Sequence, residues 1–228
     1  MAIFKFAKEF LFLLYLLILI FGFLRRKQLG DSIFYFLFAI LLNLLIELNG
    51  FVRESFVMKN MLQYMGIIYA VFVLGGTVSL FITYFKNLAL SGQFRRIQTV
   101  LLIANLLTIT AGLILSADFR ETLKGWPLYT SFTILIVSIG LFLYEMYNSD
   151  VILNILTYYP FYVAFGLLFI YVGIFPVMYF RFHLDTDVDR KIFDILLFSV
   201  NLIGYSGILV GIFLARKLET PKVDHGIH

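Results

Sequence analysis

Long apolar runs alternate with short polar stretches along the whole chain. A helix rises 1.5 Å per residue and the hydrocarbon core of a bilayer is about 30 Å thick, so about 20 apolar residues suffice for one crossing. Seven runs have this length and carry no Lys or Arg at their centres. The pattern therefore predicts seven membrane-spanning helices at Phe4–Leu24, Ile33–Val52, Met61–Phe85, Val100–Ala117, Leu128–Tyr147, Tyr159–Phe180 and Phe193–Arg216.

The same runs argue against membrane strands. Strands of a membrane barrel are about ten residues long and alternate between apolar and polar positions. The runs of this chain are longer and apolar on all sides. We therefore expect an all-α, polytopic membrane protein, in which residues 1–217 form a bundle of about seven transmembrane helices with short loops and residues 218–228 form a short polar C-terminal tail.

One apolar stretch is too short to cross a bilayer. Val151–Tyr158 lies between the fifth and sixth predicted helices, and Pro160 follows it closely. Proline suits the first turn of a helix, so Pro160 is expected to begin the sixth helix. Val151–Tyr158 is then expected to lie along the membrane interface.

Composition strengthens the membrane assignment. Hydrophobic residues make up 61% of the 228 residues, charged residues only 14%, and the mean hydropathy is +0.95. A soluble domain carries about a quarter charged residues, so much of this surface must face the lipid bilayer. The net charge of +4 comes from small basic groups that flank the apolar runs, which gives no reason to expect a nucleic-acid partner.

The distribution of basic residues bears on orientation, because cytoplasmic loops are enriched in Lys and Arg. With the N-terminus outside, the cytoplasmic side carries Arg25, Arg26, Lys27, Lys86, Arg95, Arg96, Arg216, Lys217 and Lys222. The outer side then carries Lys5, Lys8, Arg53, Lys59, Arg120, Lys124, Arg181, Arg190 and Lys191. These sets are equal in size, but three basic residues follow the first span directly. We therefore expect an inner-membrane protein with its N-terminus outside and its C-terminus in the cytoplasm.

Four polar residues inside the spans are candidates for binding a ligand or a proton. An ionisable residue within a span costs about 2.5–3.5 kcal/mol to insert, so its presence indicates a functional or structural role. Glu47 is the clearest case, and Asn43 shares its helix face at i, i+4. Asn105 and Asn201 occupy corresponding positions in loosely similar Asn-Leu stretches of the fourth and seventh spans. The alternative for Glu47 is a structural hydrogen bond to a neighbouring helix near the interface.

Catalytic and metal-binding motifs are missing from the sequence. Cys is absent, which excludes disulfides and thiolate ligands, and there is no paired-histidine zinc motif or nucleophile elbow. Asp185, Asp187 and Asp189 alternate as in a calcium loop, but Arg190 and Leu196 occupy the positions where an EF-hand needs Gly and Glu. We therefore expect neither a metal site nor a cofactor, and no catalytic residue is assigned.

Small residues mark candidate helix contacts. Gly207 and Gly211 are four residues apart in the last span, and Gly66 and Gly75 each precede a small residue by four in the third. Such spacing lets two helix backbones approach closely. We expect these contacts inside one bundle, with a homodimer face as the alternative.

The fifth and sixth spans carry a resemblance to a known group. Leu143–Asp150, the stretch Pro160-Phe161-Tyr162 and the segment around Gly166–Phe169 look like those of uncharacterised short seven-span proteins of Bacteroidota. That resemblance implies seven spans and an association with sensory systems.

Three functions are compatible with these features. The first is a sensory or accessory subunit whose membrane partner, or a second copy of itself, provides the output. The second is a small-molecule or ion transporter, for which Glu47, Pro176 and the Gly75-Gly76 pair are candidate elements. The third is a membrane-embedded enzyme acting on lipid, which would need Glu47 and the three Asn residues to converge on one pocket.

Overall fold

The computed structural model describes residues 2–55, 65–116, 119, 125–183 and 187–216, and in this part of the chain every regular element is helical. The long elements are α1 (Ala2–Leu24), α3 (Ile33–Ser55), α6 (Gly92–Leu115), α8 (Trp126–Tyr147), α9 (Tyr159–His183) and α10 (Asp187–Leu214). The shorter ones are α2 (Arg26–Leu29), α4 (Met65–Tyr69), η2 (Ala70–Val78), α5 (Ser79–Leu88) and η3 (Asp150–Thr157). The all-α prediction is confirmed for these residues.

Among the described residues, five helices are long and apolar enough to cross a membrane. They are Ile67–Leu88, Gly92–Leu115, Trp126–Tyr147, Tyr159–Met178 and Ile195–Leu214. The described apolar parts of α1 and α3, Glu9–Leu24 and Ile33–Leu48, precede them. These lengths and compositions indicate a multipass membrane protein.

Helix boundaries depart from the predicted spans mainly where polar residues continue a helix past its apolar part. α6 begins at Gly92, about two turns before the predicted Val100. Ser91 explains this start, because its Oγ accepts a hydrogen bond from the Phe94 N–H at 3.2 Å and caps the helix. The predicted polar tail at residues 218–228 lies outside the described residues.

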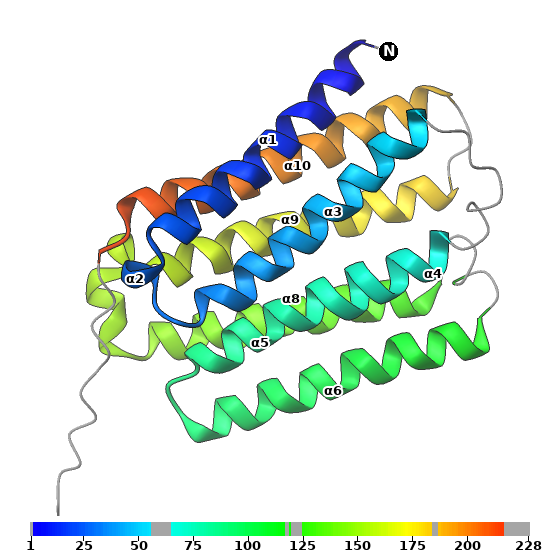
Figure 1. Cartoon of the computed structure of the whole chain (residues 1–228). Coiled ribbons are helices and arrows are strands. Elements are labelled where there is room, and N and C mark those ends of the chain that lie inside the picture. Colours follow the sequence, from blue (N-terminus) through cyan, green and yellow to red (C-terminus); the bar gives the residue numbers. More distant parts are fainter. Residues whose placement is uncertain (1, 56–64, 117–118, 120–124, 184–186, 217–228) are drawn as a thin grey trace, which may run out of the picture.

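The helices lie side by side, with their long axes roughly aligned (Figure 1). α10 packs most extensively against α9 and also contacts α1, and α1 contacts α3. On the other side of the bundle, α6 packs against α8 and α5. The connection between the two sides runs through α3 with η2 and α5, and through α8 with α9.

Aromatic side chains fill the centre of the bundle. Phe36, Phe81, Phe85, Tyr84 and Tyr159 are almost completely buried, and Phe36 lies within ring-contact distance of Phe81, Tyr84 and Tyr159. The outward faces are equally apolar, for example Leu107 and Leu115 of α6, which are 64% and 77% exposed. Exposed apolar faces of this extent are unfavourable in water and match a hydrocarbon surrounding.

Close contact between α9 and α10 depends on glycines. A Cβ added to Gly166 would lie 2.7 Å from the Gly204 carbonyl oxygen, and a Cβ on Gly204 would lie 2.7 Å from that of Gly166. Gly173 faces Val200 and Gly211 faces Tyr162 with similarly little space. The two backbones can therefore meet only because these positions lack side chains.

The third predicted span contains a π-helical segment, η2, between α4 and α5. Two side chains bind backbone carbonyls of this segment. Asn105 Nδ2 of α6 donates to the Leu74 carbonyl at 3.0 Å, and Thr77 Oγ1 donates to the Phe72 carbonyl at 3.3 Å. Such bonds satisfy carbonyls that an irregular helix would otherwise leave exposed to hydrocarbon.

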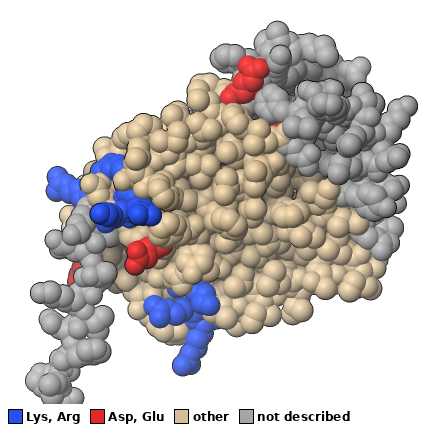
Figure 2. Space-filling view, in the orientation of Figure 1, with Lys and Arg blue, Asp and Glu red and all other residues tan. Residues whose placement is uncertain are grey.

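The described basic side chains lie at one end of the bundle, while the other Lys and Arg residues of the sequence fall outside the described side chains. The described ones belong to Arg25, Arg26, Lys27, Lys86, Arg95, Arg96 and Arg216, and the blue atoms visible in Figure 2 lie at that end. Arg25 follows α1 and donates to the carbonyls of Ile212, Phe213 and Ala215, the Phe213 bond being 2.8 Å long. It therefore caps the C-terminal end of α10 with a positive charge, which the helix dipole favours.

The short segment predicted to lie at the interface forms the 3-10 helix η3. Leu153 and Leu156 are strongly exposed on it, while Val151 and Ile155 pack against the core. Pro160 lies in the first turn of α9, as predicted. The Arg216 N–H donates to the Thr157 carbonyl at 3.2 Å, so η3 also contacts the chain just after α10.

Candidate functional site

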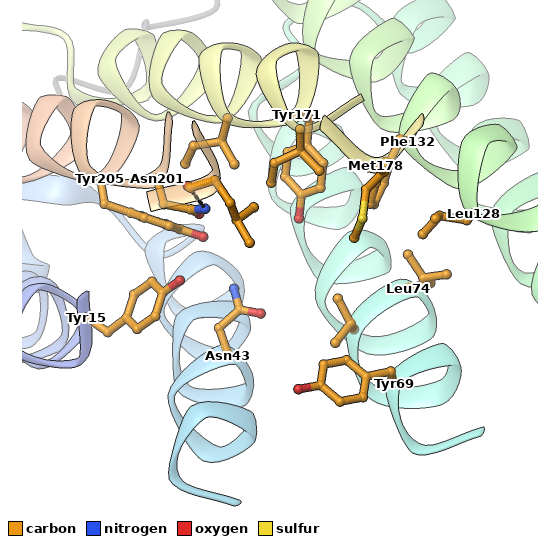
Figure 3. Close-up of a pocket in the computed structure, with 14 residues that line it drawn as sticks. Tyr15, Asn43, Tyr69, Leu74, Leu128, Phe132, Tyr171, Met178, Asn201 and Tyr205 are labelled. Atoms are coloured by element: carbon orange, nitrogen blue, oxygen red, sulfur yellow. Dashed lines mark hydrogen bonds between the residues drawn. The ribbon is translucent and has the colours of Figure 1, made fainter. Parts of the chain in front are cut away.

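A cavity of about 170 Å³ lies inside the bundle, between α1, α3, α4–η2, α8, α9 and α10 (Figure 3). Its wall is mostly apolar, but six lining residues are polar: Tyr15, Asn43, Tyr69, Tyr171, Asn201 and Tyr205. No Lys, Arg, Asp or Glu is among the described residues that line it. A mostly apolar pocket with a few converging polar groups is the usual form of a small-molecule site.

Three of these polar groups form one cluster at the α1–α3–α10 side of the cavity. The Tyr205 hydroxyl lies close to the Tyr15 and Asn43 side chains, and all three point toward one another in Figure 3. The Tyr15 and Tyr205 rings meet edge to face, with centroids 4.7 Å apart. Thr77 Oγ1 of η2 lies 3.3 Å from Asn43 Oδ1 and shares its single hydrogen between this oxygen and the Phe72 carbonyl, which joins the cluster to the π-helical segment.

Glu47 lies near this cluster. It is half-buried on α3, one turn from Asn43, and it interacts electrostatically with both Tyr15 and Tyr205. Its carboxylate is not part of the cavity lining. Glu47 can therefore influence the hydroxyl groups of the cavity, but a ligand in the cavity would meet the tyrosines first.

Two polar groups on α9 and α10 are available to a ligand. Tyr171 is 5% exposed, its hydroxyl points into the cavity, and it has no hydrogen-bond partner among the described residues. Asn201 donates through Nδ2 to the Leu197 carbonyl at 2.7 Å, while its side-chain oxygen accepts no hydrogen bond from a described residue. A buried polar group without a partner costs about 1–3 kcal/mol, and an occupant with the right polar atoms would recover this.

The structure separates the residues singled out in the sequence. Asn43 and Asn201 come together at the cavity, and Glu47 lies next to it. Asn105 does not line it, because its amide is used at the Leu74 carbonyl and at Ser79 Oγ, 3.2 Å away. Convergence of Glu47 and all three Asn residues, which a lipid-modifying enzyme would need, is therefore not observed.

The candidate packing glycines also differ in their surroundings. Gly211 lies against Tyr162, whereas a Cβ on Gly207 would meet nothing within 4 Å. Gly75 lies in η2, where an added Cβ would make ordinary contacts with the Ala70 carbonyl and Ile109. Gly66 lies in α4, and its surroundings are outside the described part of the structure.

Sequence reasoning missed the cavity tyrosines. Tyr15, Tyr171 and Tyr205 lie near the middle of their predicted spans, but only Asn and Glu residues were predicted as polar site residues there. A hydroxyl at the centre of a bilayer needs a polar partner, so mid-span Tyr was the available signal.

A second buried polar site lies at the basic end. Glu145, at the end of α8, accepts a hydrogen bond from the Ser91 N–H at 2.6 Å, so its carboxylate sits at the N-terminus of α6, where the helix dipole favours a negative charge. Burial raises the pKa of the adjacent Tyr158 to about 12, and the Glu145 charge adds to the shift. The Ser91–Glu145 hydrogen bond and the Glu145–Tyr158 interaction thus link the start of α6, the end of α8 and the residue that follows η3.

The described residues contain no group of three His, Cys, Asp or Glu side chains that could hold a metal ion. The acidic stretch Asp185–Asp189 falls in a region whose side chains are outside the described part. Neither known protein families, nor characterised proteins, nor solved structures give a match to this chain.

Proposed function

We propose that this protein is a sensory or accessory subunit of a membrane complex and that its bundle cavity binds a small molecule. One observation carries the proposal. Hydroxyl and amide groups from α1, α3, α4, α9 and α10 converge on one cavity. The stretches between the apolar helices are too short to form a soluble output domain. A binding role that passes its signal to a partner suits this arrangement.

Seven spans are part of the proposal. α1 and α3 each contain 23 residues, which corresponds to about 35 Å of helix. They lie alongside the five apolar helices named above in Figure 1 and contribute Tyr15 and Asn43 to the cavity. The resemblance of the fifth and sixth spans to seven-span proteins of Bacteroidota favours the same count and a sensory association.

The test is whether the protein has a partner in its own membrane. We expect purification in a mild detergent, after cross-linking in native membranes, to recover a second membrane protein in fixed stoichiometry. Leu197→Phe should lower the amount of partner recovered, because Leu197 lines the cavity and the larger side chain would fill it. Leu196→Phe is the matched control, since Leu196 is the exposed neighbour on the same helix. Recovery of the protein alone in every condition contradicts the proposal.

The alternative function is a small-molecule or ion transporter, and the π-helical η2 favours it. Transporters often bind substrate beside an irregular helix near the middle of the membrane. Leu74 of η2 lines the cavity, and Gly75 and Gly76 follow it directly. Substrate flux in proteoliposomes that Leu197→Phe abolishes, without any partner, would establish this alternative.

A further inference from the structure

The cavity has the size of one substituted ring. Apolar cavities of about 150 Å³ admit a benzene molecule, and this one measures about 170 Å³. Its apolar wall includes Leu74, Phe132, Ile174 and Met178. An apolar ring would therefore fill the space and contact these side chains.

The orientation of the aromatic residues indicates how an occupant would be recognised. Tyr15, Tyr69 and Tyr171 present their hydroxyl ends to the cavity in Figure 3 rather than their ring faces. A cage for an organic cation needs ring faces around the charge. Hydroxyl ends instead favour an uncharged occupant that forms hydrogen bonds.

Polar groups lie on two sides of the cavity. Tyr171 on α9 provides a hydroxyl without a described partner, and the cluster of Asn43, Tyr15 and Tyr205 lies on the α1–α3 side. The described lining carries no formal charge, and a charged occupant would pay a large desolvation penalty there. A neutral ring that carries two oxygen acceptors would offer one partner to the Tyr171 hydroxyl and one to this cluster.

We propose that the cavity binds the ring of an uncharged, membrane-soluble quinone or quinol, with one ring oxygen at Tyr171 and the opposite one at the Asn43–Tyr15–Tyr205 cluster. This inference rests on the proposed function, because it names the ligand class of the same cavity. Such molecules partition into the bilayer, so they reach the bundle from the lipid side.

The experiment compares two probes of matched shape on the full chain in nanodiscs. One is 2,5-dimethyl-1,4-benzoquinone, and the other is 1,2,4,5-tetramethylbenzene, in which methyl groups replace the two oxygens. Equilibrium dialysis against empty nanodiscs removes the contribution of lipid partitioning. We expect saturable binding of the quinone, at least about fivefold tighter than that of the hydrocarbon.

Variants assign the binding to the cavity. Tyr171→Phe should weaken quinone binding about fivefold and leave hydrocarbon binding unchanged, since it removes one hydrogen bond and keeps the ring. Tyr159→Phe makes the same chemical change at a buried hydroxyl that has no hydrogen-bond partner among the described residues and lies outside the cavity lining, so both probes should bind as before. Leu197→Phe should abolish binding of both probes, while Leu196→Phe should not.

The outcomes separate the two proposals. Equal affinity for both probes, with no effect of Tyr171→Phe, overturns the quinone assignment but leaves a ligand cavity in place. Tighter binding of tetramethylammonium than of the quinone also overturns it, in favour of a cation site. No saturable binding of any probe overturns the inference entirely, while co-purification of a partner decides the sensory role independently. Unfolding temperatures confirm that each variant is folded.

Discussion

At the scale of single residues, the three candidate asparagines have two different roles. Asn43 and Asn201 face the cavity, whereas Asn105 is completely buried and binds the backbone of η2. Each of the three amides takes part in at least one hydrogen bond, as a polar group within a span requires, although the Asn105 Oδ1 accepts none from a described residue. The sequence indicates that each Asn needs a hydrogen-bond partner, but it does not indicate which residue that partner is, because this depends on how the helices pack against one another.

Asn105→Leu should destabilise the protein through the Leu74 carbonyl. The substitution removes a donor at 3.0 Å and leaves that carbonyl without this partner in a dry surrounding. We expect the free energy of unfolding to fall by about 1 kcal/mol, within the range of measured interhelical hydrogen bonds. Unfolding by SDS in mixed micelles measures this.

Thr110→Val is the comparison for that change. The Thr110 hydroxyl is exposed and donates to the Leu106 carbonyl of its own helix at 2.8 Å. Its loss should have the smaller effect. If Asn105→Leu were as stable as the wild type, the proposed support of η2 would be wrong.

Polar positions of the site could be predicted only in part. Asn43, Asn201 and Glu47 stand out because amides and carboxylates are rare within spans. The cavity tyrosines do not, since Tyr is common at membrane interfaces and the chain contains 14 of them. Only their placement midway along a span distinguishes Tyr15, Tyr171 and Tyr205.

At the scale of elements, the pairing of α9 and α10 depends on a few glycines among many. Gly204 and Gly166 meet backbone to backbone, while Gly207, one turn along α10, faces open space. Spacing alone did not distinguish these positions, because a four-residue interval describes a helix face without saying what that face contacts.

Gly204→Ala and Gly207→Ala therefore form a matched pair on one helix. The new methyl group at position 204 would lie 2.7 Å from the Gly166 carbonyl oxygen, and overpacking of this kind costs about 1–3 kcal/mol. At position 207 alanine meets nothing and improves helix propensity. We expect the unfolding temperature to fall for Gly204→Ala and to stay equal or rise for Gly207→Ala. Equal effects of the two variants contradict the described contact.

At the scale of the whole molecule, hydropathy predicted where helices occur but not how they pack. Each apolar run corresponds to helix in the described part of the chain, because backbone polar groups in lipid must bond within their own segment. The start of α6 at Gly92 was not predicted, because its first turns are polar and depend on the Ser91 cap. The cavity was not predicted either, because its lining comes from helices that are distant in sequence.

Orientation is predicted from the residues that follow the first span. Arg25, Arg26 and Lys27 come directly after α1, at the end of the bundle where the other described Lys and Arg side chains also lie, so we predict that this end faces the cytoplasm. The chain has no Cys, so single thiols can be introduced at Lys27, which is exposed at that end, and at Asn60 in the predicted loop Arg53–Asn60. A membrane-impermeant maleimide applied to cells whose inner membrane is accessible from outside should label Asn60→Cys and spare Lys27→Cys. The opposite pattern reverses the topology.

The bond from Arg25 to α10 has a mechanical consequence. α1 and α10 both border the cavity, through Tyr15 and through Asn201 and Tyr205, and the Arg25 guanidinium ties the end of one helix to the last carbonyls of the other. Two helices that are hydrogen-bonded at one end cannot slide past each other there. A displacement of either helix at the cavity would therefore move both helix ends together, next to η3, to which the Arg216 N–H is hydrogen-bonded.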